Sequence, residues 1–327
     1  MKQAIYKTHG DAAEVIEIAE REPQPLAPGE TRVKILRAPI NPSDVFQIAG
    51  QYGIQPPLPA PAGMEGIGRV SEVNGEGLPA GTLVLLPVPP GTWATEKVFA
   101  SHTLVPVPEA DIDQLSMISV NPATAYLLLT QYVSLQEGDW LIQSAANSAV
   151  GRYVTQLAKA RGIRVASVVR RESAIADVME AGADAAFVDG PDLQKRVAAE
   201  LDGVPVLALD AVAGKTLGRL AATLAPNGVA VLYGGMSGEN ATLSDASVIF
   251  KNVSIRGFWL VHWFQNSSRD EQQQVYAELT ALILEGKLNA PVDRIFPLED
   301  IKEALAYTMK GERAGKVLIA PNGLSSR

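Results

Sequence analysis

Two patterns of apolar and polar positions follow one another along the chain. Over roughly the first 115 residues, short apolar runs such as "TRVKILRA", "GIGRVSEV" and "GTLVLLPV" are separated by turns rich in Pro and Gly. Apolar runs of this length, bounded by turn residues, indicate the strands of a barrel-like β unit. The first part of the chain is therefore predicted to be a β domain.

From about Gln136 onwards, short apolar runs alternate with stretches that have helical spacing. The stretches 150–161, 172–182 and 214–224 repeat Ala, Leu and Val at helical intervals. The apolar runs lie at 139–145, 163–169, 185–189, 204–212, 228–235 and 253–260. Continuous apolar strands that alternate with helices predict an α/β fold whose parallel sheet is covered on both faces. Six such strands are typical of a doubly wound dinucleotide-binding fold.

The last part of the chain returns to β character. Residues 269–286 predict a long helix, and "RIFPLEDIKEALAYTMKGERAGKVLIA" then predicts strand, helix, turn and strand. We expect this tail to pack back on the N-terminal β unit. The predicted domains are therefore 1–118 with 266–327, which form the β domain, and 119–265, which form the nucleotide domain.

Composition narrows the class of protein. The chain has 327 residues, 47% hydrophobic and 20% charged, which is an ordinary globular mixture with room for two cores. A net charge of −8 argues against a nucleic-acid partner. No apolar stretch approaches the ~20 residues that span a bilayer, and the N-terminal segment lacks a signal pattern. We expect a cytoplasmic protein without a membrane partner.

The residue types exclude several kinds of chemistry. The chain has no cysteine, so disulfides, thiol catalysis and zinc sites built on thiolates are excluded. Only His9, His102 and His262 can donate an imidazole, and they are far apart in sequence. No ligand spacing predicts a metal site, and none is expected.

The stretch "QSAANSAVGRYV", residues 143–154, lies where the first apolar run turns into a helix. The free N–H groups of a helix N-terminus and the helix dipole favour a bound anion such as a pyrophosphate. The usual glycine fingerprint is reduced to Gly151, but the neighbouring residues are small. Asn147 can adopt left-handed backbone angles more easily than most residues other than glycine. The turn therefore predicts a dinucleotide site, with a plain βα turn as the alternative.

The end of the second apolar run predicts which dinucleotide is bound. An NAD site places an acidic residue there for the ribose 2′-hydroxyl, but this chain has Arg170 and Arg171. Two guanidinium groups suit the 2′-phosphate of NADP, which they can hold by bidentate hydrogen bonds. Glu172 follows and is expected to begin the next helix, where acidic residues are favoured. The alternative is a solvated basic pair on a loop.

These features resemble the medium-chain dehydrogenase/reductase superfamily. In its zinc enzymes a Cys ligand precedes a Gly-His-Glu segment that supplies a His ligand. Here "NPSD" at 41–44 and "GMEGIG" at 63–68 place Asn41 and Met64 in those positions, and the four-cysteine loop is missing. The resemblance implies the zinc-free quinone oxidoreductase branch, with a six-stranded Rossmann sheet and a GroES-like β-barrel catalytic domain.

Within that branch the chain is similar to the mitochondrial-type trans-2-enoyl thioester reductases. The motifs that carry this resemblance span nearly the whole chain, in the order "NPSDVFQIAGQYGIQPPLP", "GTWATEKVF", "VNPATAY", "NSAVGRYVTQLA", "VLYGGMSG", "RGFWLVHWF" and "GKVLI". The chain lacks the transit peptide of the organellar members, which suits a bacterial form.

The resemblance also implies roles for individual residues. A tyrosine in the segment matching "GQYG" is the proposed proton donor or polarising group, which implies this role for Tyr52. The implied NADP contacts are Asn121, Asn147, Ser148, Ala149, Val150, Arg170, Arg171, Tyr233, Gly234, Gly235, Met236, Phe258, Trp259, Leu260 and Lys316.

The chemistry of these side chains leaves alternatives open. A tyrosine stays protonated at neutral pH and suits an oxygen on which negative charge builds, but Tyr52 can equally pack on the nearby prolines. Trp259 and Trp263 either wall the acyl or nicotinamide site or fill a seam between domains. His262 is expected to be structural, and Lys316 either reaches the cofactor or faces solvent.

Three functions are compatible with this sequence. The first is NADPH-dependent reduction of the 2,3 double bond of an enoyl thioester of CoA or acyl carrier protein. The second is reduction of a quinone or enone by NADPH, and the third is non-catalytic NADPH binding. A homodimer is expected by resemblance, with the run "VSIRGFWL" at an exposed sheet edge pairing with its twin.

Overall fold

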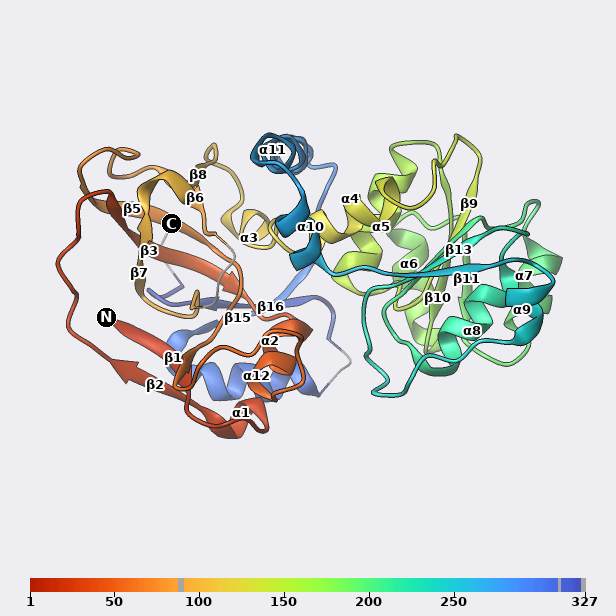
Figure 1. Ribbon diagram of the computed structural model, residues 1–327, viewed down its shortest axis with the longest axis horizontal. Coiled ribbons are helices and arrows are strands. Elements are labelled where there is room, and N and C mark those ends of the chain that lie inside the picture. The colour runs from red at the N-terminus through yellow and green to blue at the C-terminus, as the bar shows by residue number, and fades with distance from the viewer. Residues whose placement is uncertain (88–90, 311–312, 325–327) are drawn as a thin grey trace. The chain divides into compact units, whose positions relative to one another are not determined.

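The computed structural model describes residues 1–87, 91–310 and 313–324, and these form two compact units. The first unit is Met1–Val120 with Thr280–Arg327, and the second is Asn121–Leu279. The chain therefore leaves the first unit after Val120 and returns to it at Thr280, later than residue 266. Figure 1 shows the chain path through each unit.

The later return has a local cause in helix α11 (Arg269–Leu284). Glu278 of this helix accepts a hydrogen bond of 2.8 Å from the Tyr126 hydroxyl of α4 (Asn121–Thr130). Arg161 also lies within 3.9 Å of the Glu278 carboxylate. These contacts join most of α11 to the second unit, although the sequence alone suggested a helix of the first.

The second unit is built on a parallel sheet of six strands. In space the strands follow the order β11, β10, β9, β12, β13, β14, which confirms the predicted doubly wound α/β fold. Their bounds are β9 Trp140–Gln143, β10 Arg164–Val169, β11 Ala185–Val188, β12 Leu207–Asp210, β13 Val229–Leu232 and β14 Ser254–Gly257.

Helices connect and cover these strands (Figure 1). The central strands are buried along their whole length, as their continuous apolar runs predicted. The helices are α5 Ala149–Lys159, η2 Glu172–Ala174, α6 Ile175–Glu180, α7 Leu193–Glu200, α8 Gly214–Thr223, α9 Asp245–Ile249 and α10 Leu260–Asn266, besides α4 and α11.

One predicted strand is wrong in its second half. The run 253–260 was expected to be a strand throughout, but β14 ends at Gly257 and α10 begins at Leu260. All four residues of β14 are exposed, because it is the last strand of the sheet and has a neighbour on one side only. An apolar run alone cannot tell a strand from the first turn of a buried helix.

The first unit contains two sheets: the smaller one is antiparallel, and the larger one is antiparallel except that its C-terminal strands β15 and β16 pair in parallel. The smaller sheet has the order β2, β1, β4 and the larger has the order β15, β16, β3, β5, β6, β8, with β7 paired to β3. The strands are β1 Lys2–Tyr6, β2 Ile16–Glu20, β3 Glu30–Pro39, β4 Ala60–Pro61, β5 Ile67–Asn74, β6 Leu83–Leu85, β7 Glu96–Ala100, β8 Val105–Pro106, β15 Val292–Pro297 and β16 Lys316–Ala320.

The tail packs on the N-terminal β unit as predicted. Strand β16 pairs antiparallel with β3, with Leu318 opposite Pro39. One buried core combines Tyr6 and Trp93 from the N-terminal segment with Phe296 and Ile319 from the tail. The short helices of this unit are α1 Ala12–Val15, α2 Pro42–Ile48, η1 Ser101–Thr103, α3 Ile112–Leu115, η3 Leu298–Asp300 and α12 Ile301–Met309.

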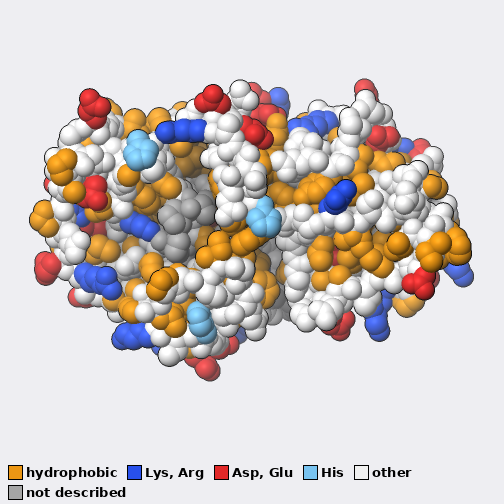
Figure 2. Space-filling view, viewed as in Figure 1, with side chains coloured by type: hydrophobic (Ala, Val, Ile, Leu, Met, Phe, Trp, Pro, Cys, Tyr) orange, Lys and Arg blue, Asp and Glu red, His pale blue; other side chains and the backbone are white. Residues whose placement is uncertain are grey.

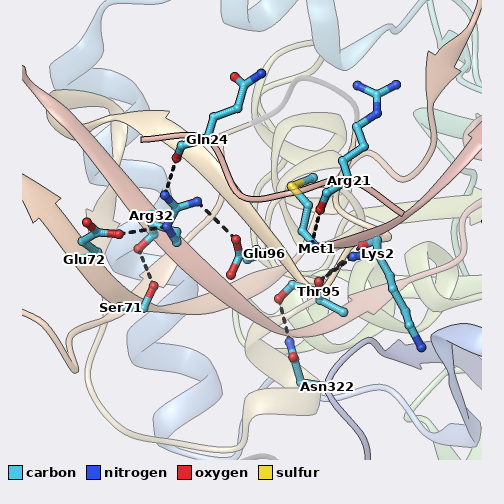
Figure 3. Close-up of polar contacts among 10 residues, drawn as sticks. All are labelled: Met1, Lys2, Arg21, Gln24, Arg32, Ser71, Glu72, Thr95, Glu96 and Asn322. Atoms are coloured by element: carbon cyan, nitrogen blue, oxygen red, sulfur yellow. Dashed lines mark hydrogen bonds and ion pairs between the residues drawn. The ribbon is translucent and has the colours of Figure 1, made fainter. Parts of the chain in front are cut away.

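A buried arginine ties the strands of the larger sheet together (Figure 3). Arg32 on β3 donates to the Glu72 carboxylate of β5 at 3.0 Å and to the Glu96 carboxylate of β7 at 3.1 Å. A separate contact holds the tail, because the Asn322 amide donates to the Thr95 carbonyl at 2.6 Å. Polar contacts as well as apolar packing therefore fix the tail against the β unit.

Candidate functional site

The turn between β9 and α5 has the geometry of an anion site. Ser148 caps the helix, and its hydroxyl accepts a 3.1 Å hydrogen bond from the Gly151 N–H. Asn147 is exposed and Ser148, Ala149 and Val150 are half-buried, so the start of the helix is open within the second unit. The N–H groups of the first turn and the helix dipole therefore favour a phosphate here.

One residue other than glycine in this turn has left-handed backbone angles. Ala145, and not Asn147, adopts a positive φ, of 46°. The one glycine that the turn keeps is required by close approach, because a Cβ on Gly151 would lie 2.6 Å from the Ala146 carbonyl oxygen. Gln143 supports this packing, since its amide donates to the Gly151 carbonyl at 3.0 Å.

Arg170 and Arg171 directly follow strand β10. Arg170 is exposed and Arg171 is half-buried, so a guanidinium pair stands at the carboxyl end of the strand beside the turn. Glu172 begins the 3-10 helix η2, as expected, and so sits where an acidic residue is favoured at a helix start. The place at which an NAD site carries an acidic residue therefore holds two arginines.

The other predicted contacts of the second unit follow later strands. Tyr233, Gly234, Gly235 and Met236 come directly after β13, and Phe258, Trp259 and Leu260 come after β14, while Asn121 begins α4. Because the strands are parallel, the segments that follow them lie at the same edge of the sheet, where doubly wound folds bind ligands. The structure thus brings the segments that follow β13 and β14 to the same edge as the turn after β9.

Tyr233 is the residue of this set whose hydroxyl is buried. Within the described residues, its oxygen has no hydrogen-bond partner. Burial, with a smaller contribution from the nearby Asp210 carboxylate, raises the pKa of Tyr233 above its ordinary value. The phenol is therefore a neutral donor, and a bound polar group would satisfy it.

A cavity of about 280 Å³ lies in the second unit beside the end of β14. Aromatic side chains form much of its wall, and Trp259 and His262 meet edge-on with ring centroids 4.9 Å apart. The lining residues are Gln131, Tyr132, Gly257, Phe258, Trp259, His262, Trp263, Asn266, Ser267 and Glu271. Trp259, Trp263 and His262 thus all border a cavity, which favours the wall interpretation for the two tryptophans.

Tyr52 lies in the first unit, on the loop that follows α2. Its side chain is half-buried and its neighbours Gln51 and Gly53 are exposed. The ends of the loop are held, because the Gln51 N–H donates to the Phe46 carbonyl at 2.8 Å and the Gln47 amide donates to the Ile54 carbonyl at 3.3 Å. Hydrogen bonds therefore fix the backbone on both sides of Tyr52.

Lys316 is buried, at 7% exposure, so the solvent-facing alternative is wrong. Its ammonium donates to the Ile40 carbonyl at 2.9 Å and to the Asn41 side-chain oxygen at 2.5 Å. The Asn41 amide donates in turn to the Glu65 carboxylate at 2.7 Å. Asp44 completes the group by accepting from the Asn41 N–H at 2.7 Å.

One member of this buried charge cluster, Asn41, occupies the position that corresponds to the Cys ligand of the zinc enzymes. Desolvation raises the pKa values of Glu65 and Asp44 and lowers that of Lys316, while the ammonium and the carboxylates oppose these shifts by attraction. Within the described residues, no group of three His, Asp or Glu side chains is arranged to hold a metal ion. The cationic member of the cluster is the Lys316 ammonium.

Removing one partner of the buried charge cluster is expected to destabilise the first unit. Lys316→Met should lower the free energy of unfolding by about 3–5 kcal/mol, because Glu65 and Asp44 lose their cation. The double variant Lys316→Met/Glu65→Gln should recover part of this loss. Denaturant unfolding measures both, and a single variant as stable as wild type would contradict the assignment.

Two protein-family models match this chain. An "Alcohol dehydrogenase GroES-like domain" family model matches residues 27–109, and a "Zinc-binding dehydrogenase" model matches residues 149–281. A GroES-like unit joined to a doubly wound dinucleotide unit defines a medium-chain dehydrogenase/reductase. In this chain Asn41 and Met64 replace the ligands of the zinc enzymes.

Relatives and solved structures identify the branch. The chain is 38% identical over 322 residues to the mitochondrial enoyl-[acyl-carrier-protein] reductase of Rattus norvegicus, covering 95% of this chain and 86% of that protein. It is 36% identical over 326 residues to the one from Dictyostelium discoideum, covering 95% and 92%. The chain belongs to the zinc-free enoyl reductase family of the medium-chain dehydrogenases/reductases.

Solved structures agree with this membership. The mitochondrial 2-enoyl thioester reductase heterodimer from Candida tropicalis superposes with a TM-score of 0.88 at 31% identity, covering 98% of this chain and 99% of that one. A putative NADPH:quinone reductase from Bacillus thuringiensis superposes with a TM-score of 0.90 at 27% identity, covering 98% of both chains.

Several residues of the second unit escaped the sequence analysis. Gln143, Ser144 and Asp210 are buried polar side chains at the carboxyl ends of β9 and β12. Each sits at the end of an apolar run, and a polar residue in that place is a signal of the ligand edge of a parallel sheet. Their contacts could not be assigned before the neighbouring strands were known.

Proposed function

We propose that the protein is an NADPH-dependent enoyl thioester reductase, which reduces the 2,3 double bond of a trans-2-enoyl group carried on CoA or acyl carrier protein. The observation that carries this proposal is the 38% identity, along 95% of the chain, to a protein named enoyl-[acyl-carrier-protein] reductase. A relative in this branch has been solved with NADP and crotonyl-CoA. The family membership makes a purely non-catalytic NADPH-binding role the weaker alternative.

The second unit fits NADP. A pyrophosphate fits the start of α5, where Gly151 leaves room for close packing and the N–H groups of Ala149 and Val150 are unpaired by the helix itself. Arg170 and Arg171 would hold the 2′-phosphate. NADPH held there would supply the hydride for the β carbon of the enoyl group.

Tyr52 has the chemistry that the second half of the reaction requires. Negative charge develops on the thioester oxygen as the β carbon is reduced, and a neutral donor aimed at this oxygen lowers the barrier. A phenol donates while it remains protonated at neutral pH, and it can also supply the proton that the α carbon takes up. We assign Tyr52 this polarising or proton-donating role.

A second candidate is the reduction of quinones or small enones, which the likeness to the Bacillus thuringiensis protein favours. The two functions share hydride addition to an activated double bond, but only the thioester reductase must accommodate a pantetheine arm. The aromatic cavity beside Trp259 is compatible with either an acyl chain or a ring.

The test compares several substrates at a fixed concentration of the enzyme. NADPH oxidation is followed with crotonyl-CoA, a longer 2-enoyl-CoA and a benzoquinone, and the same substrates are then offered with NADH. We expect the enoyl thioesters with NADPH to have the highest kcat/KM. A higher kcat/KM for the benzoquinone would favour the second candidate, and no turnover of any of them would contradict both.

We also propose a homodimer formed through the edge of the second unit. Strand β14 has no neighbour on its outer side in the described chain, and Ile255 on it is 39% exposed. Ile249 and Phe250 of the adjacent segment are 68% and 83% exposed. Figure 2 shows apolar side chains at the surface of this unit, in the region in which Figure 1 places α9. A second copy that adds its own β14 would cover them.

Charged side chains on this edge are expected to separate the dimer. Light scattering at micromolar concentration should give a dimer for the wild type and a monomer for Phe250→Glu/Ile255→Glu, because burying two carboxylates opposes association. Met179→Glu changes an exposed apolar residue of the same unit and serves as the control. A monomeric wild type would remove the proposal.

We also propose that the protein is located in the cytoplasm, although the relatives are named as mitochondrial enzymes. In the described chain no helix combines the length and apolarity that crossing a membrane requires. Fractionation of the source cells would decide between the cytoplasm and an organelle.

A further inference from the structure

The order of strands in the second unit reverses between β9 and β12. These two strands are neighbours in the sheet, yet β10 and β11 extend from β9 to one side while β13 and β14 extend from β12 to the other. Dinucleotides bind across such a reversal, one half of the molecule on each side. Arg170 and Arg171, at the end of β10, mark the side that takes the half carrying the 2′-phosphate.

A buried hydrogen-bonded pair spans this reversal. Ser144, directly after β9, donates its hydroxyl to the Asp210 carboxylate at the end of β12, at 2.5 Å. The same hydroxyl accepts from the Ala211 N–H at 3.0 Å, and the Ser144 N–H donates to the Leu209 carbonyl at 2.9 Å. Both side chains are buried, with 1% and 0% exposure. The carboxyl ends of the two halves are therefore joined by side chains as well as by the sheet.

Asp210 also holds a strained turn. Its carboxylate accepts from the Val212 N–H at 3.0 Å and from the Ala213 N–H at 2.9 Å. Ala213 has φ 66° and ψ −151°, a backbone conformation that is almost restricted to glycine. A non-glycine residue stays in this conformation only where its surroundings fix it, and the two hydrogen bonds to Asp210 do so.

The strained turn supports the loop that follows β13. The Met236 N–H donates to the Ala211 carbonyl at 3.0 Å, and the Ser237 N–H donates to the Val212 carbonyl at 2.9 Å. The Tyr233 N–H donates to the Asp210 carbonyl at 2.9 Å. Residues 233–236, which were predicted to contact the cofactor, thus rest on the turn that Asp210 holds.

We propose that Asp210, together with Ser144, is a positioning residue for the half of the cofactor that lacks the 2′-phosphate. Asp210 acts through the turn 211–214 and the loop 233–237 and does not itself bind the cofactor. The inference rests on the proposed NADPH-dependent function, since it concerns the same site. It assigns Arg170 and Arg171 to one half of the cofactor and the Ser144–Asp210 pair to the placement of the other.

The carboxylate is the part of Asp210 that this role requires. An ionised carboxylate is an acceptor at both oxygens, and here it accepts from the Ser144 hydroxyl and from two backbone N–H groups. In an Asp210→Asn variant one of these oxygens becomes an NH₂ group, which would oppose the Ala213 N–H. The side chain keeps its size, but the turn loses an acceptor and leaves a buried donor unsatisfied.

The experiment compares the Kd values of two ligands, of which only one contains the nicotinamide half of the cofactor. Calorimetric titration gives the Kd of NADPH, which spans both halves, and the Kd of 2′,5′-ADP, which carries the 2′-phosphate and lacks the nicotinamide half. For Asp210→Asn we expect the Kd of NADPH to rise by about 5- to 100-fold, as for one unsatisfied buried donor. The Kd of 2′,5′-ADP should stay within about 3-fold of wild type.

Two further variants separate positioning from general loss of structure. Asp189→Asn removes a carboxylate that follows β11 and accepts from Thr216 at 2.7 Å, and it should leave the ratio of the two Kd values unchanged. Ala213→Gly, added to Asp210→Asn, should restore most of the NADPH affinity, because glycine adopts this backbone conformation without the carboxylate. If Asp210→Asn does not fold, Ser144→Ala takes its place, with the same direction expected.

The outcomes distinguish this inference from the proposed function. An Asp210→Asn variant with the wild-type ratio of Kd values would overturn the inference and leave the function intact. Equal weakening of NADPH and 2′,5′-ADP, not reversed by Ala213→Gly, would overturn it as well, since the carboxylate would then be merely structural. A wild-type protein that binds neither ligand would contradict the proposed function itself.

Discussion

Replacing Tyr52 by Phe is expected to lower kcat on an enoyl thioester by about 10- to 1000-fold, the cost of one transition-state donor. The substitution removes one oxygen and leaves the ring. KM should change less than kcat, because the hydrogen bond to the thioester oxygen strengthens as charge develops on it. Steady-state kinetics with crotonyl-CoA and saturating NADPH measure both constants.

The control for this variant is another tyrosine of the first unit. The Tyr307 hydroxyl donates to the Asp293 carboxylate at 2.8 Å, so Tyr307→Phe also removes a phenol oxygen but should keep kcat. Thermal unfolding and NADPH affinity should match wild type for Tyr52→Phe, since the residue lies outside the nucleotide unit. Full turnover by Tyr52→Phe would exclude it from the mechanism, and lower stability together with lower rate would support the packing role.

The second large effect is expected from Arg170 and Arg171. Replacing both by Ala should raise the Kd of NADPH by about 10- to 150-fold for each arginine that holds the 2′-phosphate, since charge-assisted hydrogen bonds contribute roughly 1.5–3 kcal/mol. The Kd of NADH, which lacks this phosphate, should change little. Fluorescence titration of both cofactors with the wild type and the double variant gives the comparison.

Arg164 offers a matched control for the arginine pair. It stands at the start of β10, the strand that Arg170 follows, and it pairs with Asp202. Arg164→Ala therefore removes a guanidinium from the other end of the same strand and should leave the Kd of NADPH unchanged. A wild-type protein that prefers NADH would show that the two arginines do not select the cofactor.

The apolar pattern predicted the sheet of the second unit because its central strands are buried on both faces. Strands β9, β10 and β12 lie within the predicted runs 139–145, 163–169 and 204–212. The pattern could not place the end of β14, because the residues after Gly257 are apolar for another reason: they line a cavity and begin α10. An apolar residue indicates burial but does not show whether the strand continues, so the end of a strand can be predicted only from an additional signal such as a turn residue.

The candidate site was predictable where residue type alone carries the chemistry. Ser148 at a helix start and Arg170 after a strand are local signals, and both residues lie at the expected edge of the sheet. Lys316 was not predictable in this way, because its partners Ile40 and Asn41 are far away in the sequence. Asp210 was missed for the same reason, since its role depends on which strand lies beside β12.

The position of β16 has a consequence for the order in which the protein forms during synthesis. This strand is the last one in the described residues, yet it lies between β15 and β3 inside the larger sheet. A nascent chain that has reached residue 279 contains the whole second unit but neither of these C-terminal strands. The ribosome therefore delivers a complete nucleotide unit first, and the end of β3 at Ala38 and Pro39 lacks its β16 partner until residues 316–320 emerge.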